Sequence, residues 1–170
     1  LVFGVLGKEV GFPASVFCFY LGNGYYGLSL AMKEPFRWTY LRGHSYSVAV
    51  FTERYIGMSP VLEDTYPYRV GTVTGWDTAR WHSVFSWFAS DLTFKGTLVL
   101  FSFIGFIYAR AWKSVYQFYN PISMLLFSTL TLGLIFVPAN NQLLHTPEGF
   151  LSTTTFVMLW CLFHKRFNYS

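Results

Sequence analysis

The sequence predicts an all-α, polytopic integral membrane protein. Of its 170 residues, 53% are hydrophobic and 22% are aromatic, whereas only 12% carry a charge. That balance is typical of membrane proteins and not of a soluble domain of this length. Apolar segments near the length of a bilayer span, about 20 residues, alternate with polar ones. We therefore expect three clear transmembrane helices, a further apolar segment near the N-terminus, and a long extracytoplasmic loop that contains a short interfacial helix.

The N-terminal region, residues 1–32, is apolar, and residues 10–32 within it are long enough to cross a bilayer. Pro13 and the Gly-Asn-Gly sequence at 22–24 are poor helix formers inside such a segment. Irregular backbone at membrane depth is tolerated where protein or water buries it. We therefore expect either a transmembrane helix or a kinked, re-entrant segment. Because the chain begins in apolar sequence without a signal-peptide pattern, we expect it to be the C-terminal part of a longer protein.

Residues 92–112 are the clearest predicted transmembrane helix, since they are almost entirely apolar between a Lys near the start and an Arg near the end. A second helix is predicted for 121–138, where Asn120 is an N-cap and Pro121 occupies the first turn. A third is predicted for 147–163, which is short and rich in threonine and is expected to pack against other helices. The remaining segments are a turn at 113–120, a loop at 139–146 and a tail at 164–170.

The short segments decide the predicted orientation, because cytoplasmic loops of membrane proteins are enriched in Lys and Arg. A lysine lies in the turn at 113–120, and Lys165 and Arg166 lie in the tail, whereas the loop at 139–146 has neither residue type. The turn and the tail are therefore predicted to be cytoplasmic, and the polar region 33–91 is extracytoplasmic. Five of the six basic residues in that region are arginines dispersed among carboxylates, a pattern typical of a site.

Arginine rather than lysine is the informative choice in the 33–91 loop. A guanidinium group holds phosphate or carboxylate through two parallel hydrogen bonds and stays charged at any physiological pH. The tryptophan and tyrosine residues of the same loop have flat faces that stack on sugar rings. The combination fits an anionic, sugar-bearing, membrane-tethered ligand. The alternative for each single residue is an interfacial aromatic belt with arginines in surface salt bridges.

Residues 79–90 are predicted to form a short interfacial helix, because their apolar side chains recur at helical spacing. If this helix continues into the membrane, Arg80, Trp87 and Asp91 share one face. If a new helix begins at Leu92, Asp91 is its N-cap instead. The sequence leaves both arrangements open.

Two histidines in the loop, His44 and His82, have side chains that titrate near neutral pH and are candidate general bases or phosphate ligands. A structural role is the alternative for each of them. His145 is a weaker candidate in the second outer loop, where Asn141 and Gln142 are suited to binding sugar hydroxyls.

Several signatures of other enzyme classes are absent from the sequence. It has no CxxC pair, no HExxH, no Walker loop and no GxSxG, and its acidic residues lack the spacing of a magnesium site. We expect neither a metal nor a cofactor. The predicted helices contain no Asp, Glu, Lys, Arg or His at 98–108, 122–137 or 150–163, so we expect any chemistry at the outer surface.

Three stretches of the sequence resemble the bacterial Wzy-type oligosaccharide repeat-unit polymerases, or O-antigen polymerases, in their C-terminal portion. They are Gly-Tyr-Tyr-Gly-Leu-Ser at 24–29, Gly-His-Ser-Tyr-Ser at 43–47, and the stretch at 75–98. The last stretch resembles the family's pattern of a Thr, a following Arg, an Asp, an aromatic residue and a Gly that lead into an apolar helix. The resemblance covers about residues 24–138. Asp91 is followed by Leu-Thr-Phe-Lys-Gly, where the family often has Phe-Gly directly, and this leaves the register of the helix start open.

The resemblance implies a multi-pass glycosyltransferase of the bacterial inner membrane with its main loop in the periplasm. It would join undecaprenyl-diphosphate-linked oligosaccharide units into O-antigen or a similar surface polysaccharide. The implied partners are a chain-length regulator and a flippase of the same pathway, and no nucleic acid is expected to bind. Arg80 and Arg69 are expected to hold the diphosphate without a metal, and His44 or Asp91 to be the acceptor base. Expected substrate-binding residues are Arg42, Trp76, Asp77, Trp81, His82 and Tyr26, with the two tryptophans as a sugar platform.

Three other functions remain open at this stage. An O-antigen ligase needs the same ingredients as a polymerase. A lipid-linked glycan transporter needs a polar path through its helices, which this sequence lacks. A non-catalytic membrane subunit would bind glycan only.

Overall fold

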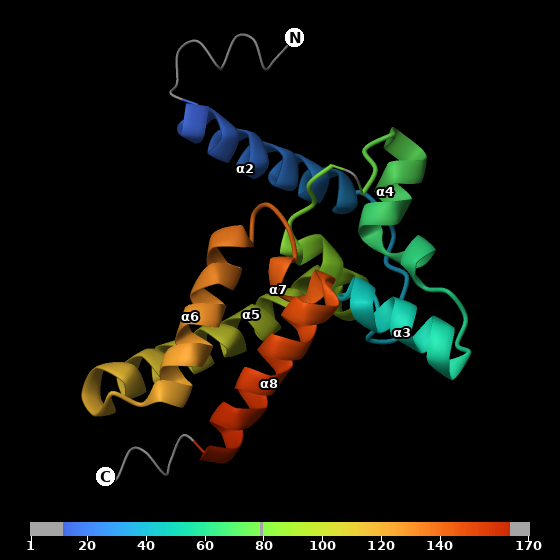
Figure 1. Cartoon of the computed structure of the whole chain (residues 1–170). Helices are drawn as coiled ribbons and strands as arrows, with labels where there is room; N and C mark the ends of the chain where they lie inside the picture. Colours follow the sequence, from blue (N-terminus) through green and yellow to red (C-terminus); the bar gives the residue numbers. More distant parts are fainter. Residues whose placement is uncertain (1–11, 79, 164–170) are drawn as a thin grey trace.

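The computed structural model describes residues 12–78 and 80–163, and the described residues form helices and connecting loops with no strand. The all-α prediction is confirmed. Figure 1 shows how the helices are arranged. They are α2 (Phe12–Ala31), α3 (Tyr46–Ile56), a 3₁₀ turn (Leu62–Asp64), α4 (Tyr66–Thr74), α5 (Val84–Phe118), α6 (Pro121–Phe136), α7 (Gln142–His145) and α8 (Pro147–Phe163).

Helices α5, α6 and α8 form one packed unit, in which α6 lies against both of the others. Its buried centre consists of Ala111, Leu126 and Trp160, one from each helix. The indole Nε1–H of Trp160 donates to the hydroxyl of Ser123 at 3.1 Å, which satisfies a polar group in an otherwise apolar contact. Asn120 caps α6 as predicted, because its side-chain oxygen accepts from the amide of Ile122 at 3.0 Å.

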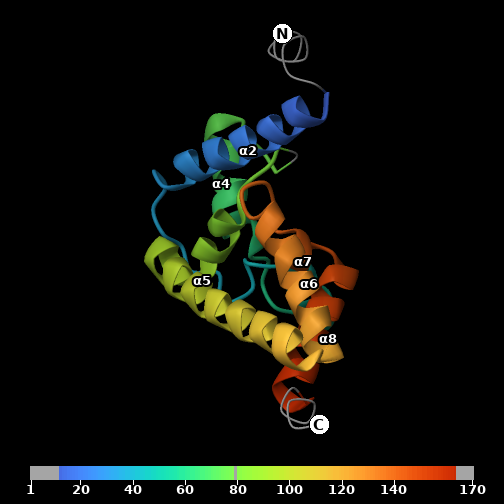
Figure 2. The same cartoon turned by 90° about the vertical axis from the view of Figure 1, so that its left-hand side faces the viewer.

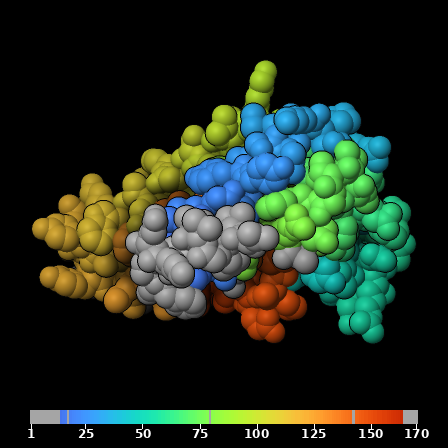
Figure 3. Space-filling model, turned by 90° about the horizontal axis from the view of Figure 1, so that it is seen from above, coloured from blue at the N-terminus to red at the C-terminus, as the bar shows by residue number. Residues whose placement is uncertain are grey.

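A second buried cluster joins α2, α4 and the start of α5. It contains Ala31, Tyr66, Val70 and Ala89. Figure 3 shows α2 and α4 side by side on the face that they share. The loop region 33–91 is therefore packed on helices at both of its ends, which gives its side chains defined positions.

Helix α5 is longer than the predicted range 92–112. It starts at Val84, whose amide donates to Val137 O at 2.9 Å, and the preceding Ser83 amide donates to Gly24 O at 3.3 Å. Both carbonyls are far away in sequence, and they accept hydrogen bonds from amides at the start of the helix that have no partner within it. Local sequence patterns do not reveal such long-range contacts. Of the predicted helix at 79–90, the described residues 80–83 are loop, whereas residues 84–90 are helical and form the first segment of α5.

The backbone of α5 is interrupted at Thr93, which has φ 64° and ψ 164°. The second helical segment restarts there, with the Thr93 hydroxyl accepting from the Gly96 amide at 3.3 Å in the manner of an N-cap. Neither predicted arrangement is observed, since the helix does not run straight through and Asp91 is not the cap. The carboxylate of Asp91 is occupied by the outer loop instead.

Among the described helices, α5 is long and apolar enough to cross a membrane. Its side chains beyond Thr93 are not those of a soluble core, because Leu98, Val99 and Phe103 are each more than half exposed. With 16 residues, α6 is apolar but about 24 Å long, short of a hydrocarbon core of about 30 Å. The structure thus supports membrane association through one helix, and the three-span arrangement stays a prediction.

Helix α2 runs without a break through residues 22–24, where a kink was one of the two predictions. Its glycines serve close packing instead. A Cβ on Gly24 would lie 1.6 Å from Pro138 O, and one on Gly27 would lie 2.9 Å from Nδ1 of His82. Figure 2 shows α2 crossing the end of the molecule where α5 begins. The contacts of α2 are therefore with the predicted extracytoplasmic segments.

Candidate functional site

Asp91 is the centre of a hydrogen-bonded network in the 33–91 region. Its side chain is 1% exposed, and its carboxylate accepts four hydrogen bonds. The hydroxyl of Thr39 at 2.5 Å and the amide of Gly43 at 3.1 Å donate to Oδ1, while the amide of His44 and its ring Nδ1, each at 2.8 Å, donate to Oδ2. Asp91 thus fixes both the backbone of the 39–44 loop and the orientation of one histidine ring.

His44 is oriented so that its second ring nitrogen is available for chemistry. Because a carboxylate only accepts, Nδ1 carries the proton in this contact, and Nε2 is the basic nitrogen of the neutral ring. The ring stacks on Phe88 with centroids 5.5 Å apart, and the side chain keeps 21% of its surface exposed. A carboxylate that holds an imidazole in one tautomer is the arrangement that general bases use.

The 39–44 loop reaches Asp91 through a tight turn. Tyr40 and Leu41 both have positive φ, 56° and 59°, a conformation that costs non-glycine residues about 1 kcal/mol or more each. Gly43 is required for a different reason, since a Cβ there would lie 2.3 Å from the hydroxyl oxygen of Thr39. The hydrogen bonds to Asp91 offset the strain of this turn.

The second outer loop is bonded to the same turn. The side-chain amide of Asn141 donates to His44 O, and the hydroxyl of Ser45 donates to Leu144 O at 2.5 Å. The hydroxyl of Ser47 donates to His145 O at 3.0 Å. The predicted loops 33–91 and 139–146 therefore form one connected structure.

A polar pocket of about 190 Å³ lies between these loops and the start of α5. The guanidinium group of Arg80 lies 4.7 Å from the centre of the Trp76 ring, and Tyr26 of α2 meets the same ring edge-on at 4.7 Å. Trp81 packs edge-on against Tyr20 at 4.7 Å. We call this the polar pocket; it is lined by Thr78, Arg80, Trp81, His82, Trp87, Asn140 and His145.

Both histidines of the polar pocket are uncharged at neutral pH. Burial lowers the pKa of His82 below its ordinary value of 6.5, and hydrogen bonds to the carbonyls of Asp77 and Trp76 oppose this only in part. Since carbonyls accept, Nε2 of His82 carries the proton, and its Nδ1 has no hydrogen-bond partner within the described part of the chain. Burial also lowers the pKa of His145. The polar pocket thus offers imidazole groups beside one cation.

The other predicted site residues lie elsewhere. Arg42 is buried and donates to Ser59 O at 3.0 Å, so it supports the loop after α3. Arg69 is buried too, 3.7 Å from the carboxylate of Glu34. It lines a different pocket from that of Arg80, so the two arginines expected to hold one diphosphate are not brought together. Asp77 is exposed near the polar pocket and contributes its carbonyl to His82.

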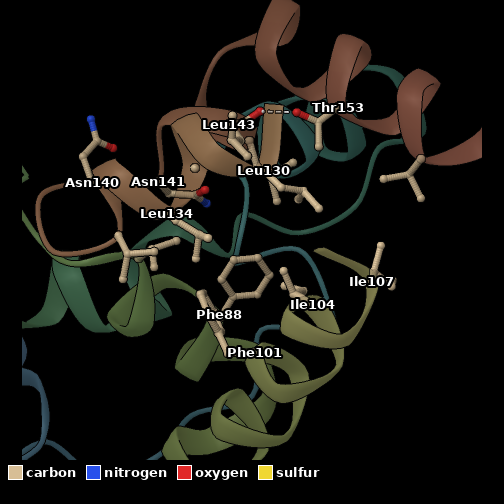
Figure 4. Close-up of a pocket in the computed structure, with 15 residues that line it drawn as sticks. Phe88, Phe101, Ile104, Ile107, Leu130, Leu134, Asn140, Asn141, Leu143 and Thr153 are labelled. Atoms are coloured by element: carbon tan, nitrogen blue, oxygen red, sulfur yellow. Dashed lines mark hydrogen bonds between the residues drawn. The ribbon is translucent and has the colours of Figure 1, made fainter. Parts of the chain in front are cut away.

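An apolar pocket of about 180 Å³ lies among α5, α6, α7 and α8. Figure 4 shows the side chains of Phe88, Ile104 and Leu130 gathered around it, with Asn140 at its periphery. Asn140 lines both this apolar pocket and the polar pocket. The two pockets are therefore neighbours at the outer end of α5.

Sequence patterns did not single out Thr39 or Asn140. Each acts through contacts between residues far apart in sequence, such as the 52 positions between Thr39 and Asp91. In the described residues, no group of three or more His, Cys, Asp or Glu side chains is placed to hold a metal ion. Comparison with family models, curated proteins and solved structures gives no match to this chain.

Proposed function

We propose that this chain is the C-terminal portion of a metal-independent, Wzy-type polymerase that joins undecaprenyl-diphosphate-linked oligosaccharide units at the periplasmic face of the bacterial inner membrane. The observation that carries the proposal is the contact between His44 and Asp91, 2.8 Å apart. Each of these residues comes from a different stretch of resemblance to that family, at 43–47 and 75–98. A contact across 47 positions between two such stretches supports their acting together.

In this proposal, His44 is the general base and Asp91 is its positioning residue. The acceptor hydroxyl of one lipid-linked unit loses its proton to Nε2 of His44 as its oxygen attacks the anomeric carbon of the growing chain. A new glycosidic C–O bond forms, and the C–O bond to the diphosphate breaks. Undecaprenyl diphosphate leaves with the electron pair. General bases of this kind contribute about 100-fold to 10,000-fold in rate.

The polar pocket is the proposed place of the departing diphosphate. Negative charge develops on that group during transfer, and Arg80 is a preplaced cation there. Trp81, Tyr26 and His82 are proposed to contact the first sugar. The guanidinium group of Arg80 lies over the ring of Trp76, and this contact is proposed to hold Arg80 in place. Arg69 and Arg42 are proposed to hold loops in place, since both are buried and engaged with protein groups.

The proposed membrane arrangement places α5 beyond Thr93, α6 and α8 across the bilayer. The loops at 33–91 and 139–146 are periplasmic in this arrangement, whereas the positively charged turn at 113–120 is cytoplasmic. The chain-length regulator and the flippase of the same pathway are proposed partners. Because α2 contacts periplasmic segments at Gly24 and Gly27, we place it over the outer end of the bundle.

The proposal is tested by the surface polymer of cells whose only copy of the full-length protein carries Arg80→Ala. We expect loss of the ladder of chain lengths, with single repeat units still attached to the final acceptor. The matched control is Arg54→Ala, another exposed arginine that lies over an aromatic ring but on α3, outside the polar pocket. A normal ladder in Arg80→Ala would contradict the proposal, and loss of single units together with the ladder would favour a ligase.

A further inference from the structure

A third pocket, of about 610 Å³, lies beside α4 and is separate from the polar pocket. Its residues come from the segment after α2, from the loop after α3, from the 3₁₀ turn at 62–64 and from one face of α4. We call it the mixed-charge pocket; it is lined by Glu34, Pro35, Arg37, Pro60, Glu63, Asp64, Tyr68, Arg69, Thr72 and Val73.

The charges of the mixed-charge pocket nearly balance. Its three carboxylates face two guanidinium groups, and Arg37 is 3.2 Å from Asp64. An isolated diphosphate is disfavoured by the carboxylates, and a lipid tail is disfavoured by the polar lining. A neutral ligand with many hydroxyl groups suits this set, because carboxylates accept hydrogen bonds from hydroxyls and guanidinium groups donate to them.

One buried group in this pocket lacks the hydrogen bonds that it can make. Arg69 is 6% exposed, and its Nε donates to Asp64 O at 3.1 Å. Its Nη2 is buried without a hydrogen-bond partner in the described residues. The guanidinium group also lies 4.8 Å from the centre of the Tyr66 ring. Because buried N–H donors are normally satisfied, the remaining hydrogen-bonding capacity of Arg69 is a reason to expect an acceptor from a bound ligand.

Tyr68 connects the mixed-charge pocket to the polar pocket. It lines the former, and its ring meets Trp87 of the latter edge-on at 6.5 Å. Its hydroxyl also bonds to Thr78, another residue of the polar pocket. Tyr68 thus lies between the mixed-charge pocket, which it lines, and two residues that line the polar pocket.

We propose that the mixed-charge pocket is a glycan subsite that binds uncharged sugar residues of the oligosaccharide through their hydroxyls. This inference rests on the proposed function, which supplies the substrate class. The diphosphate and the first sugar would occupy the polar pocket, and later sugars would extend past Tyr68 into the mixed-charge pocket. Glu63 and Asp64 accept hydrogen bonds from sugar hydroxyls there, and Arg37 and Arg69 donate hydrogen bonds to them. Recognition of the repeat unit is assigned to this pocket, whereas bond formation is assigned to His44 and Asp91.

The test measures binding of lipid-free oligosaccharides to the purified full-length protein by surface plasmon resonance. The probes are oligosaccharides of glucose, galactose, mannose and N-acetylhexosamines, the released repeat unit of the host, and free glucose. The variants are Glu63→Ala and Arg37→Ala, both at exposed positions. The controls, Glu53→Ala and Arg54→Ala, remove the same residue types from the exposed surface of α3.

We expect at least one oligosaccharide to bind more tightly than free glucose. Each pocket variant should lower the affinity for that oligosaccharide about tenfold, as expected for the loss of a charged hydrogen-bond partner. The α3 controls should bind like wild type. That pattern would support the glycan subsite even if Arg80→Ala leaves polymerisation unchanged in cells and the proposed function fails. Equal affinity in wild type and both pocket variants, or no binding of any probe, would overturn the glycan subsite.

Discussion

The region at 33–91 contains a buried network of polar side chains around Asp91, whereas α5 after Thr93 exposes large apolar side chains. Ser45, Ser90 and Asp91 are each at most 4% exposed, while Leu98 and Phe103 are 65% and 59% exposed. Burying a polar group destabilises the fold unless that group has a specific hydrogen-bond partner. An exposed apolar side chain is stabilised by any apolar surrounding, whatever its detailed geometry. We therefore expect the region at 33–91 to depend on individual hydrogen bonds, whereas α5 after Thr93 is the segment suited to an apolar surrounding such as a bilayer.

The largest expected effect is that of Asp91→Ala. The hydroxyl of Thr39, the amides of Gly43 and His44 and the His44 ring lose their common acceptor. We expect the free energy of unfolding to fall by about 3 kcal/mol or more, measured by denaturation in nanodiscs. The exposed carboxylate of Glu148 provides the control, and Glu148→Ala should change stability little. Equal stability of the two variants would remove the contrast between the regions.

The next effect tests the packing of α2. In Gly24→Ala the new methyl group would lie 1.6 Å from Pro138 O, so backbone must move, and we expect a loss of about 2 kcal/mol. Gly22→Ala, two residues earlier on the same helix, meets no atom within 4 Å and should be neutral or stabilising. Thermal unfolding midpoints of the two variants give the comparison, and equal midpoints would contradict the close contact.

A smaller effect concerns pH. Unfolded His82 takes up a proton as the pH falls through about 6.5, while the buried ring in the folded protein has a lowered pKa and does so only at lower pH. The unfolded state binds more protons in that window, so the free energy of unfolding falls on acidification. His82→Gln should weaken the difference in stability between about pH 7.5 and pH 5, leaving the part due to His145. An unchanged pH dependence would show that His82 is not buried as described.

The smallest effect is expected at an exposed apolar position of α5. Phe103→Leu replaces one exposed apolar side chain with another, so stability in nanodiscs should change by less than about 0.5 kcal/mol. Leu126→Ala, at a fully buried position between helices, should cost about 2–5 kcal/mol. A large loss in Phe103→Leu would mean that protein rather than lipid contacts this side chain.

The two regions also differ in how far the sequence predicts them. The start of α6 is coded locally by Asn120 and Pro121, and the prediction is confirmed. The start of α5 is set by Gly24 O and Val137 O, which no local pattern reveals. A new helix beginning at Leu92 was one of the two predicted arrangements, and the interruption is observed one residue later, at Thr93.

For the site, residue types were predictable but their grouping was not. Arginine, tryptophan and histidine in one outer loop indicated binding, and Arg80, Trp81 and His82 do line one pocket. His44 and Asp91 were separate candidates for one role, and only folding brings them into contact. A contact that spans 47 positions lies beyond what helical spacing predicts.

The central claim is that His44, held by Asp91, is the base for glycosyl transfer. The most direct measurement is polymer formation from undecaprenyl-diphosphate-linked repeat units by the full-length protein in proteoliposomes, with a metal chelator present. Wild type and Arg54→Ala are expected to form a ladder of chain lengths, and His44→Gln to form it about 100-fold more slowly or worse. Polymerisation by His44→Gln at the wild-type rate would contradict the claim.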